Sequence, residues 1–208
     1  MWAVVKANAY GHGIERAFDG LRGADGFALL DLAEAERVRA LGWRGPVLLL
    51  EGCFEPRDLE LCSRLNLWHT VHREAQIDWL AAHKTQQPHR VFLKLNSGMN
   101  RLGFTPGGFR ARLGAAERAA AGRRDLADDA LLRRRRRARR AARQLALFEA
   151  ATARTCPASA RWPTARRRCA TRARHGAPTG CAPGIMVYGS APDYPGARRR
   201  RTGICGRR

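Results

Sequence analysis

Two lysines in the first half of the chain stand near the ends of apolar runs that are typical of β-strands. Lys6 lies in the run WAVVKA and is followed by NAYGHG, whereas Lys94 lies in RVFLKLN and is followed by SGMNRLGF. An amine held on a rigid strand end can act as a nucleophile and carry protons, although an ordinary strand-terminal lysine is simply solvated. The small and polar residues that follow, with Tyr10 and Arg101 among them, favour the functional interpretation.

The elements that must position these lysines alternate regularly over residues 1–110. Apolar runs alternate with helical patterns, and the strand centres recur at about 20 to 25 residues, the length of a βα unit with short loops. Asp31 is placed to cap one helix, and Pro56 lies near the first turn of another. The predicted strands are 2–7, 26–30, 46–52, 67–71 and 90–96, and the predicted helices are 13–24, 31–42, 55–66, 73–84 and one that begins within 105–113.

The fold class that this alternation predicts is α/β, with parallel strands that form part of a (β/α)8 (TIM) barrel. The strands are continuous apolar runs, as expected for parallel strands covered on both faces. A dinucleotide-binding glycine motif is absent, which favours the barrel over an open doubly wound sheet, although the pattern alone leaves the open sheet possible. In a barrel the chemistry lies at the carboxyl ends of the strands, where the segments after Lys6 and Lys94 would meet.

Three segments resemble signatures of one enzyme family. AVVKANAYGHG (3–13) resembles the pyridoxal-phosphate lysine motif of alanine racemases, LKLNSGMNRLGF (93–104) resembles their second signature in its catabolic-type variant, and PGIMVYGSAP (183–192) resembles a third. The resemblance is almost continuous over 1–110 and returns near 183–195. It implies a cytoplasmic enzyme that uses pyridoxal 5'-phosphate to interconvert L- and D-alanine, and that is a homodimer in the intact family.

The resemblance implies roles for four residues of the first part. Lys6 matches the lysine that forms a Schiff base with the cofactor aldehyde and serves as the acid and base on one face of the substrate. Tyr10 matches a contact of the cofactor phosphate. Arg101 matches a residue beside the cofactor's phenolic oxygen and the substrate carboxylate, where a guanidinium fork suits an oxyanion. Lys94 matches a supporting lysine that is often carbamylated and positions that arginine.

The third motif completes the implied site, and other family features have no counterpart. Gly184 and Ile185 match backbone contacts of the cofactor phosphate, and Tyr188 matches the tyrosine of the same motif. Ala182 stands where the family has an arginine that faces the pyridine nitrogen. The family's histidine segment, its Asn-Ser phosphate motif, the segment before the lysine strand and the C-terminal β-domain with the second acid/base tyrosine are missing. The resemblance therefore implies that this chain alone has little or no activity.

The second half of the chain has a different composition. Residues 1–110 hold 14 Lys and Arg against 12 Asp and Glu, whereas residues 111–208 hold 25, all of them Arg, against 6. So few Val and Ile residues follow position 110 that we expect no inner sheet strand there, and an irregular or disordered Arg-rich segment. The predicted units are 1–110, the first part of the barrel; 111–183, rich in Arg and Ala; 184–195, the phosphate motif; and 196–208, a basic tail.

Three explanations of the Arg-rich segment differ in what they predict. It is a solvated basic run, or an arm that binds nucleic acid, although it lacks interleaved aromatics, a zinc pattern and a groove-reading helix. The third explanation is a shifted reading frame. If residues 128–132 are encoded by GAT GAC GCA CTT CTC, the same bases read one base later encode Met-Thr-His-Phe-Ser, which resembles the family's histidine segment.

The remaining features exclude several classes of protein. The six cysteines show no CxxC pair and no metal spacing, so free thiols in a reducing cytoplasm are expected, and no metal. The histidines show no ligand or triad spacing. Neither a signal peptide nor a stretch that could span a membrane is present. The alternatives to a racemase are a related pyridoxal-phosphate barrel, such as a decarboxylase or a cofactor carrier, and a non-enzymatic nucleic-acid binder.

Overall fold

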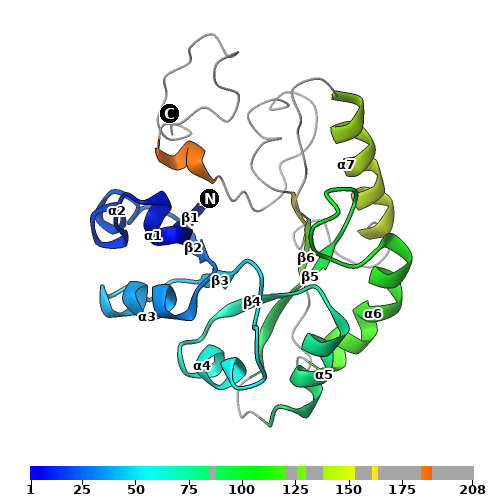
Figure 1. The fold of residues 1–208 in the computed structure, drawn as a ribbon, viewed down its shortest axis with the longest axis horizontal. Helices are drawn as coiled ribbons and strands as arrows, with labels where there is room; N and C mark the ends of the chain where they lie inside the picture. Colours follow the sequence, from blue (N-terminus) through cyan, green and yellow to red (C-terminus); the bar gives the residue numbers. More distant parts are fainter. Residues whose placement is uncertain (85–87, 120–125, 130–137, 153–160, 164–183, 189–208) are drawn as a thin grey trace.

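Seven parallel strands form one sheet, and the helices between them lie round its outer side in chain order (Figure 1). The computed structural model describes residues 1–84, 88–119, 126–129, 138–152, 161–163 and 184–188. Each strand pairs with the next one along the chain. A doubly wound sheet reverses its strand order part-way, so this order is that of a barrel wall, as the sequence predicts.

The elements are short and follow the predicted alternation closely. The strands are β1 (Trp2–Val4), β2 (Gly26–Leu29), β3 (Val47–Leu49), β4 (Trp68–Val71), β5 (Arg90–Leu95), β6 (Leu126–Asp129) and β7 (Arg161–Pro163). The helices are α1 (Lys6–Tyr10), α2 (Ile14–Gly20), α3 (Leu32–Ala40), α4 (Asp58–Arg64), α5 (Glu74–Ala82), α6 (Pro106–Ala119), α7 (Ala138–Thr152) and the 3-10 turn η2 (Ile185–Tyr188).

Both faces of the sheet are buried, as continuous apolar strands require. Ala3 packs in the large core between the sheet and the helices, whereas its neighbours Trp2 and Val4 pack in a second cluster on the other face. Successive strand side chains point to opposite faces, so one strand feeds both clusters. The second cluster has a tight point at Gly26, where a Cβ would lie 2.8 Å from the Trp2 ring.

The second half contributes more regular structure than its composition predicts. The expectation that residues 111–183 supply no inner strand is wrong at β6, which pairs with both β5 and β7. Strand pairing uses the main chain, and a buried neighbour such as β5 supports a short strand of low intrinsic propensity. The helix predicted to begin within 105–113 is confirmed as α6, so it crosses the expected domain boundary at residue 110.

Helices α6 and α7 each bury one face, which explains why an Ala- and Arg-rich sequence orders there. Among the side chains that the structure describes, the buried ones of α6 are Phe109, Leu113 and Ala116, and those of α7 are Gln144, Phe148, Ala151 and Thr152. Both sets follow the three- and four-residue spacing of one helical face. Ala182, residues 189–195 of the predicted phosphate motif and the basic tail 196–208 lie outside the described residues.

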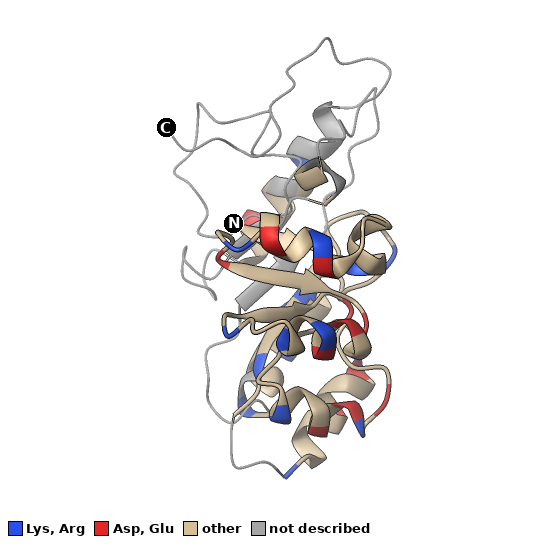
Figure 2. Cartoon of the chain, turned by 90° about the vertical axis from the view of Figure 1, so that its left-hand side faces the viewer, with Lys and Arg blue, Asp and Glu red and all other residues tan. Residues whose placement is uncertain are grey.

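The surface of the helices carries charges of both signs. Figure 2 shows Lys and Arg interspersed with Asp and Glu over the helices of this face.

Cys53 and Cys62 are free and buried, with their sulfurs 3.5 Å apart. Within the part of the chain that the structure describes, no helix is both long and apolar enough to cross a bilayer, and no group of three His, Cys, Asp or Glu side chains could hold a metal ion.

Candidate active site

The carboxyl end of β1 runs into a turn of left-handed helix that begins beside Lys6. Residues 7–10 all have φ between +52° and +56°, although none of them is glycine. The left-handed conformation costs about 1–2 kcal/mol for each such residue, so four in succession require support from their surroundings. The predicted strand 2–7 is therefore too long: it ends at Val4, and Lys6 is a partly buried residue at the start of the turn.

Main-chain hydrogen bonds close the turn on itself. The amide of Ala9 donates to the carbonyl of Val5 at 2.8 Å, and the amide of Gly13 donates to the carbonyl of Asn8 at 3.0 Å. Gly11 and Gly13 have φ of +84° and +87°, a region that glycine enters without steric cost. The glycines of the NAYGHG segment are thus explained by the return of the chain from the turn into α2.

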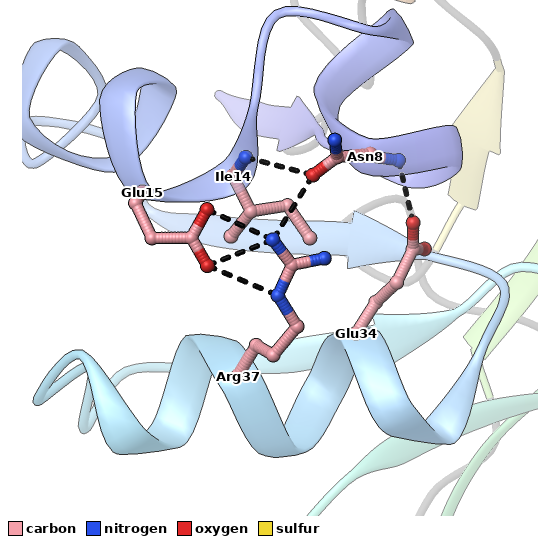
Figure 3. Close-up of polar contacts among 5 residues, drawn as sticks. All are labelled: Asn8, Ile14, Glu15, Glu34 and Arg37. Atoms are coloured by element: carbon pink, nitrogen blue, oxygen red, sulfur yellow. Dashed lines mark hydrogen bonds and ion pairs between the residues drawn. The ribbon is translucent and has the colours of Figure 1, made fainter.

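Side chains of α2 and α3 hold the middle of the turn (Figure 3). The Asn8 amide donates to Glu34 Oε1 at 2.6 Å, and Asn8 Oδ1 accepts from the Ile14 amide and from Arg37 Nη2, both at 3.1 Å. The Arg37 guanidinium also donates to both carboxylate oxygens of Glu15, at 2.7 and 2.8 Å from Nη2. One guanidinium therefore links α2, α3 and the turn.

Glu34 and Arg37 are residues that the sequence did not single out. Asp31 is confirmed as the cap of α3, because its Oδ1 accepts from the Ala33 amide at 2.8 Å. Glu34 stands three residues after that cap, where a carboxylate commonly bonds back to the amide of the capping residue. Here it reaches the Asn8 amide instead, so the spacing could have drawn attention to Glu34 but not to its partner.

Two tyrosines that are 178 positions apart in the sequence pack against each other at the carboxyl end of β1. The rings of Tyr10 and Tyr188 lie 5.5 Å apart, and His12 stacks on Tyr188 at 4.6 Å. The Tyr188 hydroxyl donates to the Val4 carbonyl at 3.0 Å. At Gly184 a Cβ would lie 2.7 Å from the Tyr10 hydroxyl, so the main chain approaches that hydroxyl where no side chain fits. His12, which lies between the two glycines of the turn, thus covers one face of Tyr188.

The two phenols share a partly buried environment. Burial raises the pKa of Tyr10, and burial, followed by the charges of Tyr10 and Glu34, raises the pKa of Tyr188 to about 12. Both hydroxyls are therefore protonated hydrogen-bond donors at neutral pH. Of the third motif, the structure brings Gly184 and Tyr188 to the Lys6 turn, and Ile185 begins η2 beside them in the chain.

The second lysine lies in a different environment from the first. Lys94 is buried on β5, and its Nζ donates to the Leu50 carbonyl at 2.8 Å. Asn96 Oδ1 accepts from two amides of the following loop at 3.0 Å, and Gly103, with φ of +104°, returns that loop against the main chain of Lys94. Arg101 is exposed on this loop and makes no hydrogen bond or ion pair with another described residue. The predicted link from Lys94 to Arg101 stays a prediction.

His72, for which the sequence predicts no role, also lies at the carboxyl ends of the strands. His72 follows β4 and is partly buried; burial, and then the charge of Lys94, lower its pKa. Its amide donates to Gln76 Oε1 at 2.8 Å, and the Gln76 side-chain amide in turn donates to the carbonyls of Glu51 and Cys53. Gln76 thereby links the segments that follow β3 and β4.

Comparison with known proteins identifies the family of the chain. The family model described as "Alanine racemase, N-terminal domain" matches residues 1–192. The chain belongs to this family. The match includes the Arg-rich segment 111–183, which favours the racemase lineage over an independent nucleic-acid-binding arm.

Relatives and solved structures agree with the family. The alanine racemase of Acidovorax sp. (strain JS42) is 58% identical over 210 residues, which cover 95% of this chain and 54% of that protein. The alanine racemase of Paracidovorax citrulli (strain AAC00-1) is 83% identical over 111 residues, or 53% of this chain and 30% of that protein. The crystal structure of the biosynthetic alanine racemase from Pseudomonas aeruginosa aligns with a TM-score of 0.81 and 34% identity over 93% of this chain and 54% of that one.

The comparisons confirm the predicted family and its barrel fold. The chain spans about half the length of the alanine racemases that it matches over nearly its whole extent, as the shares of 54% show. The activity, substrate and partners of those whole proteins therefore enter below as proposals. The roles expected for Lys6, Tyr10, Lys94 and Arg101 stay predictions, as does the division of the chain at residues 110, 183 and 195.

Proposed function

We propose that the chain forms the pyridoxal-phosphate-binding part of an alanine racemase, with Lys6 as the residue that anchors the cofactor. The observation that carries this proposal is the placement of Lys6 at the carboxyl end of β1, at the head of a left-handed turn whose last residue, Tyr10, lies against Tyr188 and Gly184. Family membership supplies the reaction class, and the turn supplies a fixed amine where barrel enzymes hold their chemistry.

The residues present fit the cofactor's chemical groups. A phosphate needs hydrogen-bond donors, and Tyr10 offers a neutral phenol where the main chain at Gly184 approaches without a side chain. An aldehyde needs a primary amine, and Lys6 supplies one from a partly buried position. We assign Lys6 to the aldehyde, and Tyr10 with the backbone of Gly184 and Ile185 to the phosphate. Tyr188 supports that backbone through its bond to the Val4 carbonyl.

In this proposal the chain's own residues bind the cofactor and move one proton. Bound pyridoxal 5'-phosphate supplies an electron sink for the pair left on the substrate's α-carbon when its proton departs. The Lys6 amine takes that proton, or returns it, on one face of the substrate. Arg101 binds the substrate carboxylate, for which a guanidinium fork suits two oxygens, and Lys94 supports the loop that carries it.

Racemisation also needs an acid and a base on the opposite face. By analogy with the family, we assign that role to a tyrosine of a C-terminal domain brought by a second subunit, so the full reaction requires more than the residues described here. The proposal therefore predicts that a polypeptide of residues 1–208 alone binds the cofactor but turns over little L-alanine into D-alanine.

The test separates cofactor binding from turnover. Purified chain is titrated with pyridoxal 5'-phosphate while the absorbance of the lysine-bound cofactor is followed, and the same titration is run on Lys6→Ala and, as a matched control, on Lys84→Ala. The expected result is a saturable band in the wild type and in Lys84→Ala, and its loss in Lys6→Ala. A band that persists in Lys6→Ala would refute the assignment.

A further inference from the structure

We propose that Glu34 and Arg37 of α3 are positioning residues, which hold the left-handed turn in the conformation that aims Lys6 and Tyr10 at the site. The role of the turn in placing Lys6 and Tyr10 at a cofactor site rests on the proposed function. The support of the turn by α3 rests only on the contacts of Glu34 and Arg37. Both residues act through Asn8, in the middle of the turn, and neither is assigned to cofactor or substrate.

Side-chain support for the turn comes from α3. Among the described residues, Glu34 and Arg37 are the only side chains outside residues 6–14 that hydrogen-bond to residues 7–10. A strained backbone persists where the surrounding structure determines it, and here that structure is α3.

Glu34 accepts a hydrogen bond from a main-chain amide of the turn. The first amides of a helical turn have no partner within it, and the Asn8 amide is one of them. Glu34 Oε1 accepts from that amide at 2.6 Å, as a charge-assisted bond. The other oxygen, Oε2, is buried without a hydrogen-bond partner among the described atoms, so the bond to the Asn8 amide is the polar contact that the structure describes for this carboxylate.

Arg37 connects α3 to the side chain of Asn8. Its Nη2 donates to Asn8 Oδ1, which also accepts from the Ile14 amide, so the turn and the start of α2 share one acceptor. The Arg37 hydrogen bond is the largest cause that lowers the pKa of the Glu15 carboxyl. Because this ion pair is exposed, it adds little stability by itself. Its consequence is geometric, since Glu15 fixes the direction from which Arg37 reaches Asn8.

The test uses the full chain and two readouts. The variants are Arg37→Gln and Glu34→Ala, with Glu34→Gln as the conservative variant, because its amide oxygen can still accept from Asn8. Glu36→Gln is the matched control: Glu36 lies on the same helix but pairs with Arg64 at 3.3 Å, away from the turn. The readouts are the hydrogen-exchange rates of the Asn8 and Ile14 amides without cofactor, and the affinity for pyridoxal 5'-phosphate from its absorbance.

We expect Arg37→Gln and Glu34→Ala to speed exchange at these amides about tenfold and to weaken cofactor binding about tenfold, the effect of losing one charge-assisted hydrogen bond. Glu34→Gln and Glu36→Gln should stay within about twofold of the wild type in both readouts. A purely structural role for α3 would instead lower thermal stability in every α3 variant without rescue by Glu34→Gln.

The outcomes distinguish this inference from the proposed function. Unchanged exchange and unchanged affinity in Arg37→Gln and Glu34→Ala would overturn the inference while leaving the function intact. Faster exchange in these two variants, together with a wild type that binds no cofactor, would support the positioning role of α3 and refute the proposed function. If Glu34→Ala unfolds globally, Arg37→Gln and Glu15→Gln are measured by the same two readouts. Glu15 is exposed, and its substitution should release Arg37.

Discussion

Tyr188 fixes a distant segment of the chain to the site through one hydroxyl group. Its Oη donates to the Val4 carbonyl at 3.0 Å while its ring packs on Tyr10 and His12. The ring contacts survive removal of the hydroxyl, whereas the hydrogen bond does not. Removing the hydroxyl oxygen therefore tests the hydrogen bond to Val4 separately from the ring contacts.

We predict that Tyr188→Phe lowers the free energy of unfolding by about 1 kcal/mol, the net worth of one such hydrogen bond. Tyr10→Phe serves as the comparison, because the Tyr10 hydroxyl donates to no described residue, and it should change stability by less than about 0.5 kcal/mol. Urea unfolding followed by tryptophan fluorescence measures both. Equal losses in the two variants would show that the bond to Val4 adds nothing.

Residue types near the lysines could be predicted from the sequence, but their distant partners could not. Lys6, Tyr10, Gly184, Ile185 and Tyr188 were expected to lie near one another. Lys6, Tyr10, Gly184 and Tyr188 are placed at the carboxyl end of β1, and the side chain of Ile185 lies outside what the structure describes. Glu34 and Arg37 were missed because they act through Asn8. Such a contact depends on how α3 packs beside the turn, which no local spacing shows.

At the scale of elements, the carboxyl ends of β3 and β4 approach each other at Gly52. This residue has φ of +72°, and a Cβ there would lie 1.9 Å from the Thr70 carbonyl oxygen and 2.9 Å from Gln76 Nε2. The first of these atoms is main chain and cannot turn aside. The glycine is thus required both by its conformation and by the close approach.

We predict that Gly52→Ala costs about 3 kcal/mol or more of stability, because the alanine adds a main-chain clash to the strain of positive φ. Gly42→Ala isolates the strain, since Gly42 has φ of +92° but nothing within 4 Å of a Cβ, and it should cost about 1 kcal/mol. Thermal unfolding of both variants checks the difference. A cost at Gly52 no larger than that at Gly42 would contradict the packing of β3 against β4.

Three histidines meet near the amino ends of β4 and β5, on the side away from Lys6. His69 Nε2 and His89 Nδ1 lie 3.3 Å apart, and the His83 ring lies 5.1 Å from that of His89. Burial, followed by the neighbouring histidines, lowers the pKa of His69 to about 3 and that of His89 to about 4. Both are neutral in the folded chain at pH 7.

The fold should therefore lose stability in acid. Unfolded histidines bind protons near pH 6.5, whereas folded His69 and His89 bind them only near pH 3 to 4, so the unfolded state holds more protons between those values. Each site then removes up to about 1.4 kcal/mol per pH unit as the pH falls from 6.5 toward 4. Urea unfolding from pH 7 to pH 4 measures the slope. His69→Asn should reduce the slope, and an unchanged slope would contradict the burial of His69.

The alternation of strands and helices could be predicted because apolar runs and helical spacing are local. The ends of the elements were less predictable: the run 2–7 is uniformly small or apolar until Lys6, yet the backbone turns left-handed there because α3 and the following glycines hold it. Strands β6 and β7 were missed for a related reason, since pairing with a buried neighbour outweighs low β-propensity.

At the scale of the whole molecule, the chain matches alanine racemases over most of its own length but about half of theirs. The relative from Paracidovorax citrulli reaches 83% identity over 111 residues, whereas the one from Acidovorax sp. reaches 58% over 210. High identity over the shorter match accords with a family sequence that is better preserved in one part of the chain than in the rest.

We predict that this difference originates in the reading frame. Coding DNA for residues 128–132, read one base later, should encode Met-Thr-His-Phe-Ser, and frame changes should flank the Arg-rich segment. Sequencing the coding DNA of residues 111–183 together with peptide mass analysis of the purified chain decides the matter. An alternative frame without that histidine segment would contradict the prediction.

The most direct test of the central claim is to find which amine of the chain holds pyridoxal 5'-phosphate. The chain has three lysines, Lys6, Lys84 and Lys94. Chain incubated with the cofactor is reduced with borohydride, digested, and mapped by mass spectrometry. The account predicts that the reduced cofactor is found on Lys6. Label spread over Lys84 and the N-terminal amine, or no label on Lys6, would contradict it.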